Sequence, residues 1–489
     1  MSQHAPRTVI VLAAGKGTRM KSDLPKVLFP LLGRTLVGHV LSAATAVDAD
    51  RTAVVVGHCA DAVGAHAATI VPHVIPVLQA QQNGTGHAVR IACEALPGLT
   101  GTVLVLNGDV PLLRAETVVA LLHAHEQAGA AASVLAAEVD NPFGLGRIIR
   151  NAAGQLEQIV EERDATDAQR QVREINAGIY AFDAAHLVEQ LGKISANNDQ
   201  GEEYLTDVLG QLVVAGEKVL VHVVADAEET LGANDRAQLA DLRRRMRDRI
   251  NTAWMRSGVS ILDPQTTWID VTATIGPDAT IEANTQLYGE THLAAGAQIG
   301  PDVTLIDTTV GERATVIRTH ATSAQIGDEV SVGPFAYLRP GSVLGRKSKI
   351  GTFVETKNTE LGVGAKVPHL SYIGDATIGE GTNVGAATVT VNYDGVAKHR
   401  TEIGKHARTG ADNMFVAPVR VGDGAYTAAG SVIVNDVPPG ALGVARGQQR
   451  NIDGWVPRRR AGTAAAEAAA LALESESSAA DSGRFAADE

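Results

Sequence analysis

An aliphatic residue returns every six positions through most of the second half of this chain. The first uninterrupted run consists of Ile275, Ile281, Leu287, Leu293, Ile299 and Leu305, and glycine often follows the aliphatic position. A six-residue period fits neither the turn of an α-helix nor the alternation of a flat strand. It is typical of a parallel β-helix built from hexapeptides. The second half is therefore predicted to be a left-handed parallel β-helix, rather than a generic glycine-rich solenoid of either hand.

The six-residue count resumes at later positions up to Ile433, and it lapses in the segments 357–361 and 392–400. Loops that leave a solenoid commonly lie on its functional face. We therefore expect these two segments to flank a functional site.

The first part of the chain has a different pattern. The segments 8–14, 53–57, 103–106 and 177–182 are rich in Val, Ile and Leu without alternation, and segments with helical spacing, such as 115–128, lie between them. Buried strands separated by helices are typical of a doubly wound, Rossmann-like α/β domain.

A single helix is predicted over 234–256, where apolar residues recur at intervals of three and four. The arginines of segment 243–249 are expected to line its solvated face rather than to bind nucleic acid. The net charge of −13 also argues against a nucleic-acid partner.

These patterns divide the chain into an α/β domain (1–233), a linker helix (234–256), a β-helix (257–457) and a tail (458–489). The tail is rich in Ala, Ser and acidic residues, and we expect it to be largely disordered, with an Ala-rich helical piece around 464–473 as the alternative. Cys59 and Cys93 are expected to be free thiols. With neither a signal peptide nor an apolar run long enough for a membrane span, a cytoplasmic location is expected.

A glycine-rich turn follows the first predicted strand, with the sequence Gly15-Lys16-Gly17-Thr18-Arg19-Met20. We expect this turn to open a helix and to form a phosphate cradle, in which backbone N–H groups point at an anion and the helix dipole assists. Met20 replaces the third glycine of a dinucleotide fingerprint, and Gly-Lys is not followed by Ser or Thr as in a Walker A motif. Arg19 and Lys26 suit a triphosphate; the alternative is a tight turn with surface cations.

Asp109 directly follows the strand 103–106, at the edge of an α/β sheet where ligands bind. A single carboxylate there suits Mg²⁺, which keeps several waters and binds substrate phosphates. The alternative is a residue that caps a turn.

His369 lies between the two lapses of the β-helix count, with Arg339, Lys357 and Lys398 in the surrounding segments. Three cations suit a sugar phosphate, and an imidazole suits the removal of a proton from an amine near neutral pH. The alternative is a surface or stacked histidine of the solenoid.

The segment 12–20, together with Pro25-Lys26, resembles the signature of the sugar-1-phosphate nucleotidylyltransferases. The segment 79–88 is similar to the one with which uridylyltransferases read the nucleobase. Joined to the hexapeptides, nearly everything from about Thr8 to Trp455 resembles a family of bifunctional bacterial enzymes. These acetylate glucosamine-1-phosphate with acetyl-CoA and then uridylylate the product with UTP, giving UDP-N-acetylglucosamine for peptidoglycan and cell-wall biogenesis. The resemblance implies Mg²⁺ as cofactor and a homotrimer.

The resemblance also implies residue roles. His369 would be the general base of acetyl transfer, Arg19 and Lys26 would be catalytic in uridylyl transfer, and Asp109 and Asn234 would bind Mg²⁺. The positions that match contacts to UTP or UDP-N-acetylglucosamine are Leu12, Ala13, Ala14, Gly15, Lys26, Gln79, Gln82, Gly84, Thr85, Asn107, Gly108, Asp109, Gly146, Glu161, Asn176 and Asn234. Those that match contacts to glucosamine-1-phosphate are Arg339, Lys357, Tyr372, Asn383 and Lys398. Those that match contacts to acetyl-CoA are Ala386, Asn392, Tyr393, Ala411, Ala429 and Arg446.

One position departs from the family pattern, because Ala411 stands where the family commonly has serine. The lost hydroxyl is expected to cost about 1 kcal/mol of acetyl-CoA binding or turnover. Two alternatives remain at this stage: a nucleotidylyltransferase whose β-helix serves only assembly or regulation, and a non-enzymatic scaffold of the same ancestry.

Overall fold

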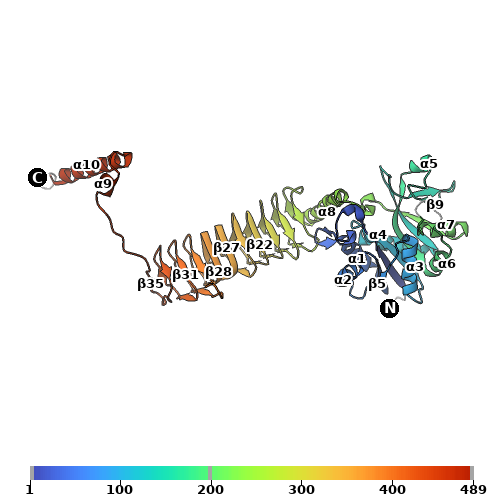
Figure 1. The fold of residues 1–489 in the computed structure, drawn as a ribbon, viewed down its shortest axis with the longest axis horizontal. Helices are drawn as coiled ribbons and strands as arrows, with labels where there is room; N and C mark the ends of the chain where they lie inside the picture. Colours follow the sequence, from blue (N-terminus) through green and yellow to red (C-terminus); the bar gives the residue numbers. More distant parts are fainter. Residues whose placement is uncertain (1–4, 197–200, 485–489) are drawn as a thin grey trace.

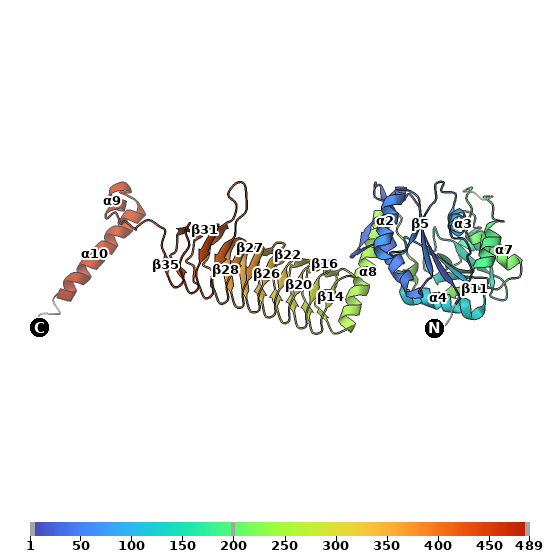
Figure 2. The same cartoon turned by 90° about the horizontal axis from the view of Figure 1, so that it is seen from below.

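The computed structural model describes residues 5–196 and 201–484. An α/β domain, a long helix and an extended β-helix follow one another along the molecule, and two further helices lie beyond the β-helix (Figure 1). The α/β domain, the long helix and the β-helix are arranged end to end, so the α/β domain and the far end of the β-helix lie well apart (Figures 1 and 2).

The α/β domain is built on a mixed sheet with the strand order β11-β7-β10-β6-β1-β4-β5. Strand β1 runs parallel to β4 and β6, whereas β10 is antiparallel to β6 and β7. The bounds are β1 Arg7–Ala13, β4 Arg51–Val56, β5 Ile75–Leu78, β6 Thr102–Asn107, β7 Ala132–Glu138, β10 Glu174–Asp183 and β11 Val219–Val223. A hairpin of β8 (Arg147–Arg150) and β9 (Leu156–Val160) extends the sheet beside β10. The predicted strands lie in β1, β4, β6 and β10.

Both faces of this sheet are covered, which explains strands without polar alternation. In β1, Val9 and Val11 pack into one apolar cluster and Ile10 into another. Because successive side chains of a strand point to opposite faces, these clusters lie on the two sides of the sheet. Helices α1 (Leu36–Ala44), α2 (Ala60–Ile70) and α4 (Ala115–Ala128) contribute to the first cluster. Helices α3 (Thr85–Ala95), α6 (Ala184–Leu191) and α7 (Thr206–Val214) contribute to the second.

The second domain is a left-handed parallel β-helix of short strands from β12 (Ser260–Ile261) to β35 (Leu442–Gly443). Ile281 pairs with Ile299, three hexapeptides later. Leu293 pairs with Val310, one residue short of that spacing, which accounts for the offset in the sequence period. The aliphatic positions form one continuous buried core along the whole β-helix.

The first lapse of the period is not a loop, contrary to our expectation. Strand β27 runs unbroken from Lys349 to Leu361. Thr356 occupies the inward position there, is fully buried, and shares a hydrogen bond of 2.8 Å with the Ser342 hydroxyl. A satisfied polar side chain has replaced an aliphatic one without disturbing the coil.

The second lapse is a true loop. Between β29 (Val389–Val391) and β30 (Thr401–Ile403) the chain leaves the β-helix and returns, and this loop stands out from its side (Figure 2). The Asp394 carboxylate accepts hydrogen bonds from the backbone N–H groups of Val396 and Ala397 and from His399, so the loop is internally bonded.

Helix α8 (Arg236–Arg256) joins the two domains, and the Asp235 side chain caps its first turn by accepting from the Gln238 N–H. Its apolar stripe is divided between the domains. Leu239, Leu242 and Met246 pack into the α/β domain, while Ile250 and Trp254 also pack against the β-helix core.

Two arginines of α8 are not on a solvated face, so our expectation is wrong for them. The buried Arg247 guanidinium lies 4.9 Å from the Trp268 ring centroid and donates to the Gln265 carbonyl. Arg249 donates to the Leu112 carbonyl of the α/β domain. Guanidinium groups both stack on rings and bond carbonyls, and here they dock the helix onto both domains.

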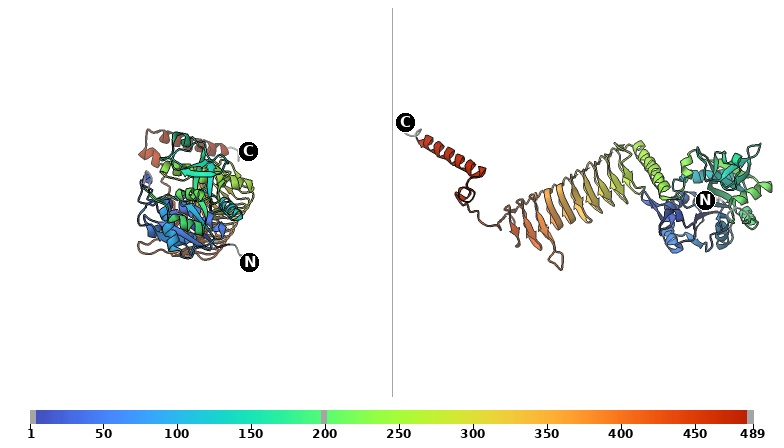
Figure 3. Two further views of the ribbon diagram at one scale, coloured as in Figure 1. Left: turned by 90° about the vertical axis from the view of Figure 1, so that its right-hand side faces the viewer. Right: turned by 45° about the horizontal axis from the view of Figure 1, so that its top comes forward.

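The tail is more helical than the largely disordered segment that we expected. The structure contains α9 (Trp455–Arg459) and α10 (Ala464–Arg484), and the last predicted tail residues, 485–489, lie outside the described part. Helix α10 covers the Ala-rich piece around 464–473 for which a helix was the alternative. Alanine has the highest helix propensity, and it dominates α10. Helix α10 lies away from the β-helix (Figures 1 and 3). Among the described residues, no helix is both long and apolar enough to cross a membrane.

The inward positions should carry most of the β-helix stability. Replacing the fully buried Leu287 by alanine is expected to cost about 2–5 kcal/mol, because the coils above and below cannot close the cavity. Denaturant unfolding followed by circular dichroism measures this loss. The matched variant Leu262→Ala removes a side chain that is 67% exposed and should change stability little; equal losses in both variants would contradict an inward-facing core.

Candidate active sites

The turn after β1 is shaped by a close approach to Lys26. Gly17 has a φ of 58°, and a Cβ at this position would lie 2.5 Å from the Lys26 Cβ. A short 3-10 turn from Thr18 to Met20 follows, and no α-helix begins before Leu36. The expectation that this turn opens a helix is therefore wrong, and a helix dipole does not assist an anion here. Backbone N–H groups and the exposed Arg19 remain as the groups available to phosphate.

Lys26, Asp109 and Asn234 meet at one point although they are far apart in the sequence. The Lys26 ammonium lies 2.5 Å from Asp109 Oδ2 and 3.4 Å from Asn234 Oδ1. Asp109 follows β6, and Asn234 stands just before the α8 cap. Two oxygen atoms that converge on one cation are a donor set that suits Mg²⁺. Within residues 5–196 and 201–484 no cluster of three or more His, Cys, Asp or Glu side chains could hold a metal.

The ends of β1 and β6 are held together beside this cluster. The Gly108 N–H donates to the Leu12 carbonyl at 2.9 Å, and a Cβ on Gly108 would lie 2.8 Å from that oxygen. Ala13 and Ala14 are buried next to Leu12. Asn107 packs against Gly178, where a Cβ would lie 2.1 Å from its amide nitrogen.

A pocket of about 280 Å³ lies beside the glycine-rich turn. Its lining residues are Lys16, Gly57, His58, Leu78, Gln79, Ala80 and Gln82. Gln79 donates to the Gly84 carbonyl at 3.1 Å, and Gln82 donates to the Ala14 carbonyl at 2.5 Å. The Thr85 hydroxyl accepts from the Leu205 N–H. Two anchored carboxamides in a small pocket suit the reading of a nucleobase edge. Lys16 and His58 line this pocket but were not among the predicted site residues.

Gly146, Glu161 and Asn176 form a third group. A Cβ on Gly146 would lie 3.3 Å from Glu161 Oε1 and 3.5 Å from the Asn176 Cβ, so glycine leaves room for both side chains. The Asn176 amide donates to the Tyr180 hydroxyl at 2.8 Å. Glu161 lines a cavity of about 380 Å³ together with Asp164, Tyr204 and Asp207, among others.

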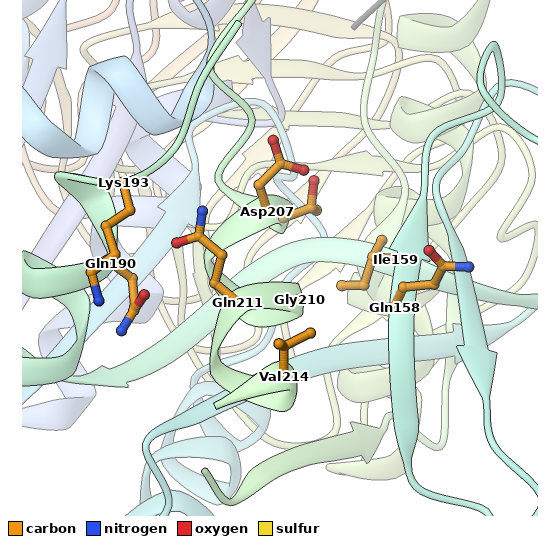
Figure 4. A pocket seen from close by; sticks show the side chains of 9 residues that line it. Gln158, Ile159, Gln190, Lys193, Asp207, Gly210, Gln211 and Val214 are labelled. Atoms are coloured by element: carbon orange, nitrogen blue, oxygen red, sulfur yellow. The ribbon is translucent and has the colours of Figure 1, made fainter. Parts of the chain in front are cut away.

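Two carboxyl groups at this cavity, Glu161 and Asp207, have raised pKa values. Burial and the nearby charges of Asp164 and Asp207 raise the pKa of Glu161, and burial together with Asp164 raises the pKa of Asp207. A second cavity, of about 490 Å³, adjoins and shares Gln158, Ile159, Thr206 and Asp207 with the first. Gln190, Lys193 and Gln211 lie on its other side (Figure 4).

In the β-helix, His369 lies on strand β28 (Lys366–Ile378), with its side chain exposed. The Ser371 hydroxyl donates to its carbonyl at 2.7 Å, which stabilises the backbone at this corner. Arg339 donates to Glu355 at 2.9 Å, and Lys357 lies 3.3 Å from Asp375.

The predicted phosphate ligands Arg339, Lys357 and Lys398 interact electrostatically. Hydrogen bonding and repulsion from Lys357 lower the pKa of Lys398, and Arg339 adds to this effect. Tyr372 lies close enough to act electrostatically on both Arg339 and Lys357. Asn383 differs: its backbone pairs with Lys366 and Arg408, on another face of the β-helix, and none of the described hydrogen bonds joins its side chain to this cluster.

The predicted acetyl-CoA residues form a column along one corner of successive coils. The Asp412 N–H donates to the Ala386 carbonyl at 2.7 Å, and the Gly430 N–H donates to the Ala411 carbonyl at 2.9 Å. Arg446 donates to the Ala429 carbonyl at 3.0 Å. The small side chains leave this corner accessible along its length. Asn392 and the exposed Tyr393 belong to the protruding loop.

The fold and these sites define a two-domain transferase, with a nucleotidyltransferase domain and a left-handed β-helix domain. The family model of the MobA-like NTP transferase domain matches residues 9–175. The Bifunctional protein GlmU of Streptomyces avermitilis is 58% identical over 474 residues, which cover 96% of this chain and 98% of the relative. Its counterpart in Corynebacterium efficiens is 52% identical over 471 residues, covering 96% and 97%. The chain belongs to the family of bifunctional GlmU proteins.

Family membership extends over both domains, so it favours the bifunctional enzyme over a single-activity enzyme or a scaffold. The protein is an acetyltransferase and uridylyltransferase that synthesises UDP-N-acetylglucosamine from glucosamine-1-phosphate, acetyl-CoA and UTP.

The pKa shifts at Glu161 yield a test. Asp164→Asn removes a charge that raises the pKa of both Glu161 and Asp207, so both values should fall towards the ordinary range. Because the folded protein retains these protons to higher pH than the unfolded chain, it loses stability as the pH rises through the raised pKa. The Asp164→Asn variant should therefore lose less folding stability than the native protein as the pH rises through this range.

Carbon NMR of labelled carboxyl groups measures these titrations, with Glu161→Gln assigning the Glu161 signal. The control is Asp167→Asn, whose side chain is fully solvent-exposed and should leave the Glu161 titration in place. An unshifted titration in Asp164→Asn would contradict the proposed repulsion.

Proposed function

We propose that residues 1–233 carry uridylyl transfer, that 257–457 carry acetyl transfer, and that the segment 234–256, which contains α8, connects them. The observation that carries the first assignment is the convergence of Lys26, Asp109 and Asn234. The second is supported by His369 and by the cations Arg339, Lys357 and Lys398 on adjoining coils.

In uridylyl transfer, the phosphate of the acetylated sugar attacks the α-phosphorus of UTP in line and expels pyrophosphate. No protein nucleophile is needed, so the protein supplies positioning and charge neutralisation. Lys26 steadies the attacking phosphate, and Arg19 holds the departing pyrophosphate. Gln79 and Gln82 hold the uracil, and Gly146, Glu161 and Asn176 contact the sugar.

Mg²⁺ would be held by Asp109 and Asn234, and when bound it supplies charge stabilisation for the phosphates. The oxygen atoms of both side chains already face the ammonium of Lys26. In the structure the Lys26 ammonium itself is the cation on which these oxygens converge, and it neutralises the Asp109 carboxylate.

In acetyl transfer, the amine of glucosamine-1-phosphate attacks the thioester carbonyl of acetyl-CoA. His369 accepts the amine proton, the C–S bond breaks, and the acetyl group passes directly to nitrogen with release of the thiol. Arg339, Lys357 and Lys398 bind the sugar phosphate, with Tyr372 beside them. The column of Ala386, Ala411, Ala429 and Arg446, with Asn392 and Tyr393, binds acetyl-CoA. Ala411 lacks a hydroxyl and weakens this binding modestly.

We further propose a homotrimer and a cytoplasmic location. Phe335 and Phe353 stack at 5.6 Å and are exposed together with Leu370, and apolar patches of this kind favour association. Asn383 lies on a different face of the β-helix from the other proposed sugar-phosphate ligands. This position is consistent with acetyl-transfer sites that form between the β-helices of neighbouring subunits. The free Cys59 and Cys93 agree with a reducing compartment.

A coupled assay tests the whole proposal. The enzyme receives glucosamine-1-phosphate, acetyl-CoA, UTP and Mg²⁺, and release of thiol and of pyrophosphate is followed separately. Both products are expected, with pyrophosphate release depending on prior acetylation; pyrophosphate without thiol would instead support the single-activity enzyme.

Replacement of the proposed base separates the two activities. His369→Ala should slow acetyl transfer about 10²- to 10⁴-fold, the usual contribution of a general base. Uridylyl transfer from N-acetylglucosamine-1-phosphate should be unchanged. His292→Ala, an exposed histidine near the start of the β-helix, is the control and should leave both rates intact. Loss of both activities in His369→Ala would argue against separate sites.

The opposite separation is expected at the proposed metal site. Asp109→Ala should reduce Mg²⁺-dependent pyrophosphate release by about a hundredfold or more, since metal charge stabilisation is worth several kcal/mol. Thiol release from acetyl-CoA should continue. Asp140→Ala, a fully exposed carboxylate of the same domain, serves as control. Normal pyrophosphate release from Asp109→Ala would refute the metal assignment.

A further inference from the structure

Asp375 is a buried carboxylate at the centre of the acetyl-transfer face, and no sequence motif singled it out. It lies at a turn within β28, with a φ of 49°. Its Oδ1 accepts a hydrogen bond of 2.7 Å from the Asn358 amide, and its Oδ2 accepts one of 2.5 Å from the Asn392 amide. The Lys357 ammonium lies 3.3 Å from Oδ2.

The donors around Asp375 come from different coils and serve different substrates. Lys357 and Asn358 lie on β27, one coil before, and Lys357 is a proposed ligand of the sugar phosphate. Asn392 follows β29, one coil after, and is a proposed ligand of acetyl-CoA. One carboxylate thus joins a group that holds the acceptor sugar to a group that holds the acetyl donor.

The charge of Asp375 is needed where it lies. Lys357 and Lys398 repel each other, and Arg339 adds a third positive charge. Burial favours the neutral acid, but hydrogen bonds from Asn358, Asn392 and Lys357 outweigh it and hold the pKa of Asp375 below its ordinary range. The group is therefore a carboxylate at neutral pH, and its fixed charge keeps the Lys357 ammonium in place despite the repulsion.

We propose that Asp375 is a positioning residue for acetyl transfer, which holds the Lys357 ammonium and the Asn392 carboxamide in one geometry. The amine of the sugar and the thioester of acetyl-CoA are thereby brought together beside His369. Asp375 acts through these two side chains and does not touch the reacting atoms. This inference rests on the proposed acetyl-transfer site.

Asp375→Asn keeps the size of the side chain but removes its charge, and it places an amide NH₂ group where a carboxylate oxygen accepted hydrogen bonds from the Asn358 or Asn392 amide. The KM for glucosamine-1-phosphate and that for acetyl-CoA should both rise, and kcat/KM should fall about ten- to hundredfold, the usual effect of losing a charge-assisted hydrogen bond. Asp270→Asn is the matched control, since Asp270 is a buried carboxylate of the first coil that accepts from the Gly289 N–H at 2.8 Å. It should leave both KM values unchanged. Equal effects of the two substitutions would overturn the proposal in favour of a general structural role.

A double-mutant cycle with Lys357→Met identifies the route of action. If Asp375 acts through Lys357, Asp375→Asn should raise the KM for glucosamine-1-phosphate much less in the Lys357→Met background than in the native one. Full additivity would overturn the proposed route. An unchanged KM in Lys357→Met alone would overturn the acetyl-transfer site itself, whereas a raised KM with an additive cycle refutes only the role of Asp375.

Discussion

The stacking of inward aliphatic side chains from coil to coil is the constraint on which the second half of the molecule depends. Ile281 lies against Ile299, and Leu287 against Leu305, and each such burial stabilises the fold by about 1.5–3 kcal/mol. Because the coils then stand only about 4.8 Å apart, residues at the same corner of successive coils become neighbours. Ala386, Ala411 and Ala429 are adjacent for this reason, and so are the groups around Asp375.

In the α/β domain, residues far apart in the sequence become neighbours through the order of the strands rather than through stacked coils. The carboxyl ends of β1 and β6 meet at one edge of the sheet, which brings the glycine-rich turn beside Asp109. Asn234 joins them only because α8 docks on this domain through Leu239, Leu242 and Met246. The segment that leads into α8 therefore supplies one residue of the candidate site, while the other end of α8 packs against the β-helix.

Both candidate sites share an electrostatic arrangement, in which the cations that we propose as phosphate ligands are paired with carboxylates. Lys26 pairs with Asp109, Arg339 with Glu355 and Lys357 with Asp375. Such pairs keep clustered cations compatible with a folded state before substrate binds, since unpaired like charges at close range are costly. They also restrict the orientation of each cation.

The sequence by itself determined the fold class of both halves, because a hydrophobic period is a local property that burial of one face imposes. Motifs also predicted Lys26, Asp109 and His369 as site residues. Only the tertiary structure decided which polar groups are satisfied in the interior. Thr356 replaces an aliphatic residue because Ser342, a coil away, bonds it, and Arg247 is buried because Trp268 and the Gln265 carbonyl receive it. Asp375 is likewise buried as a carboxylate because Asn358, Asn392 and Lys357, from neighbouring coils, surround it. A buried polar side chain depends on partners from distant segments, and that proximity exists only once the chain has folded.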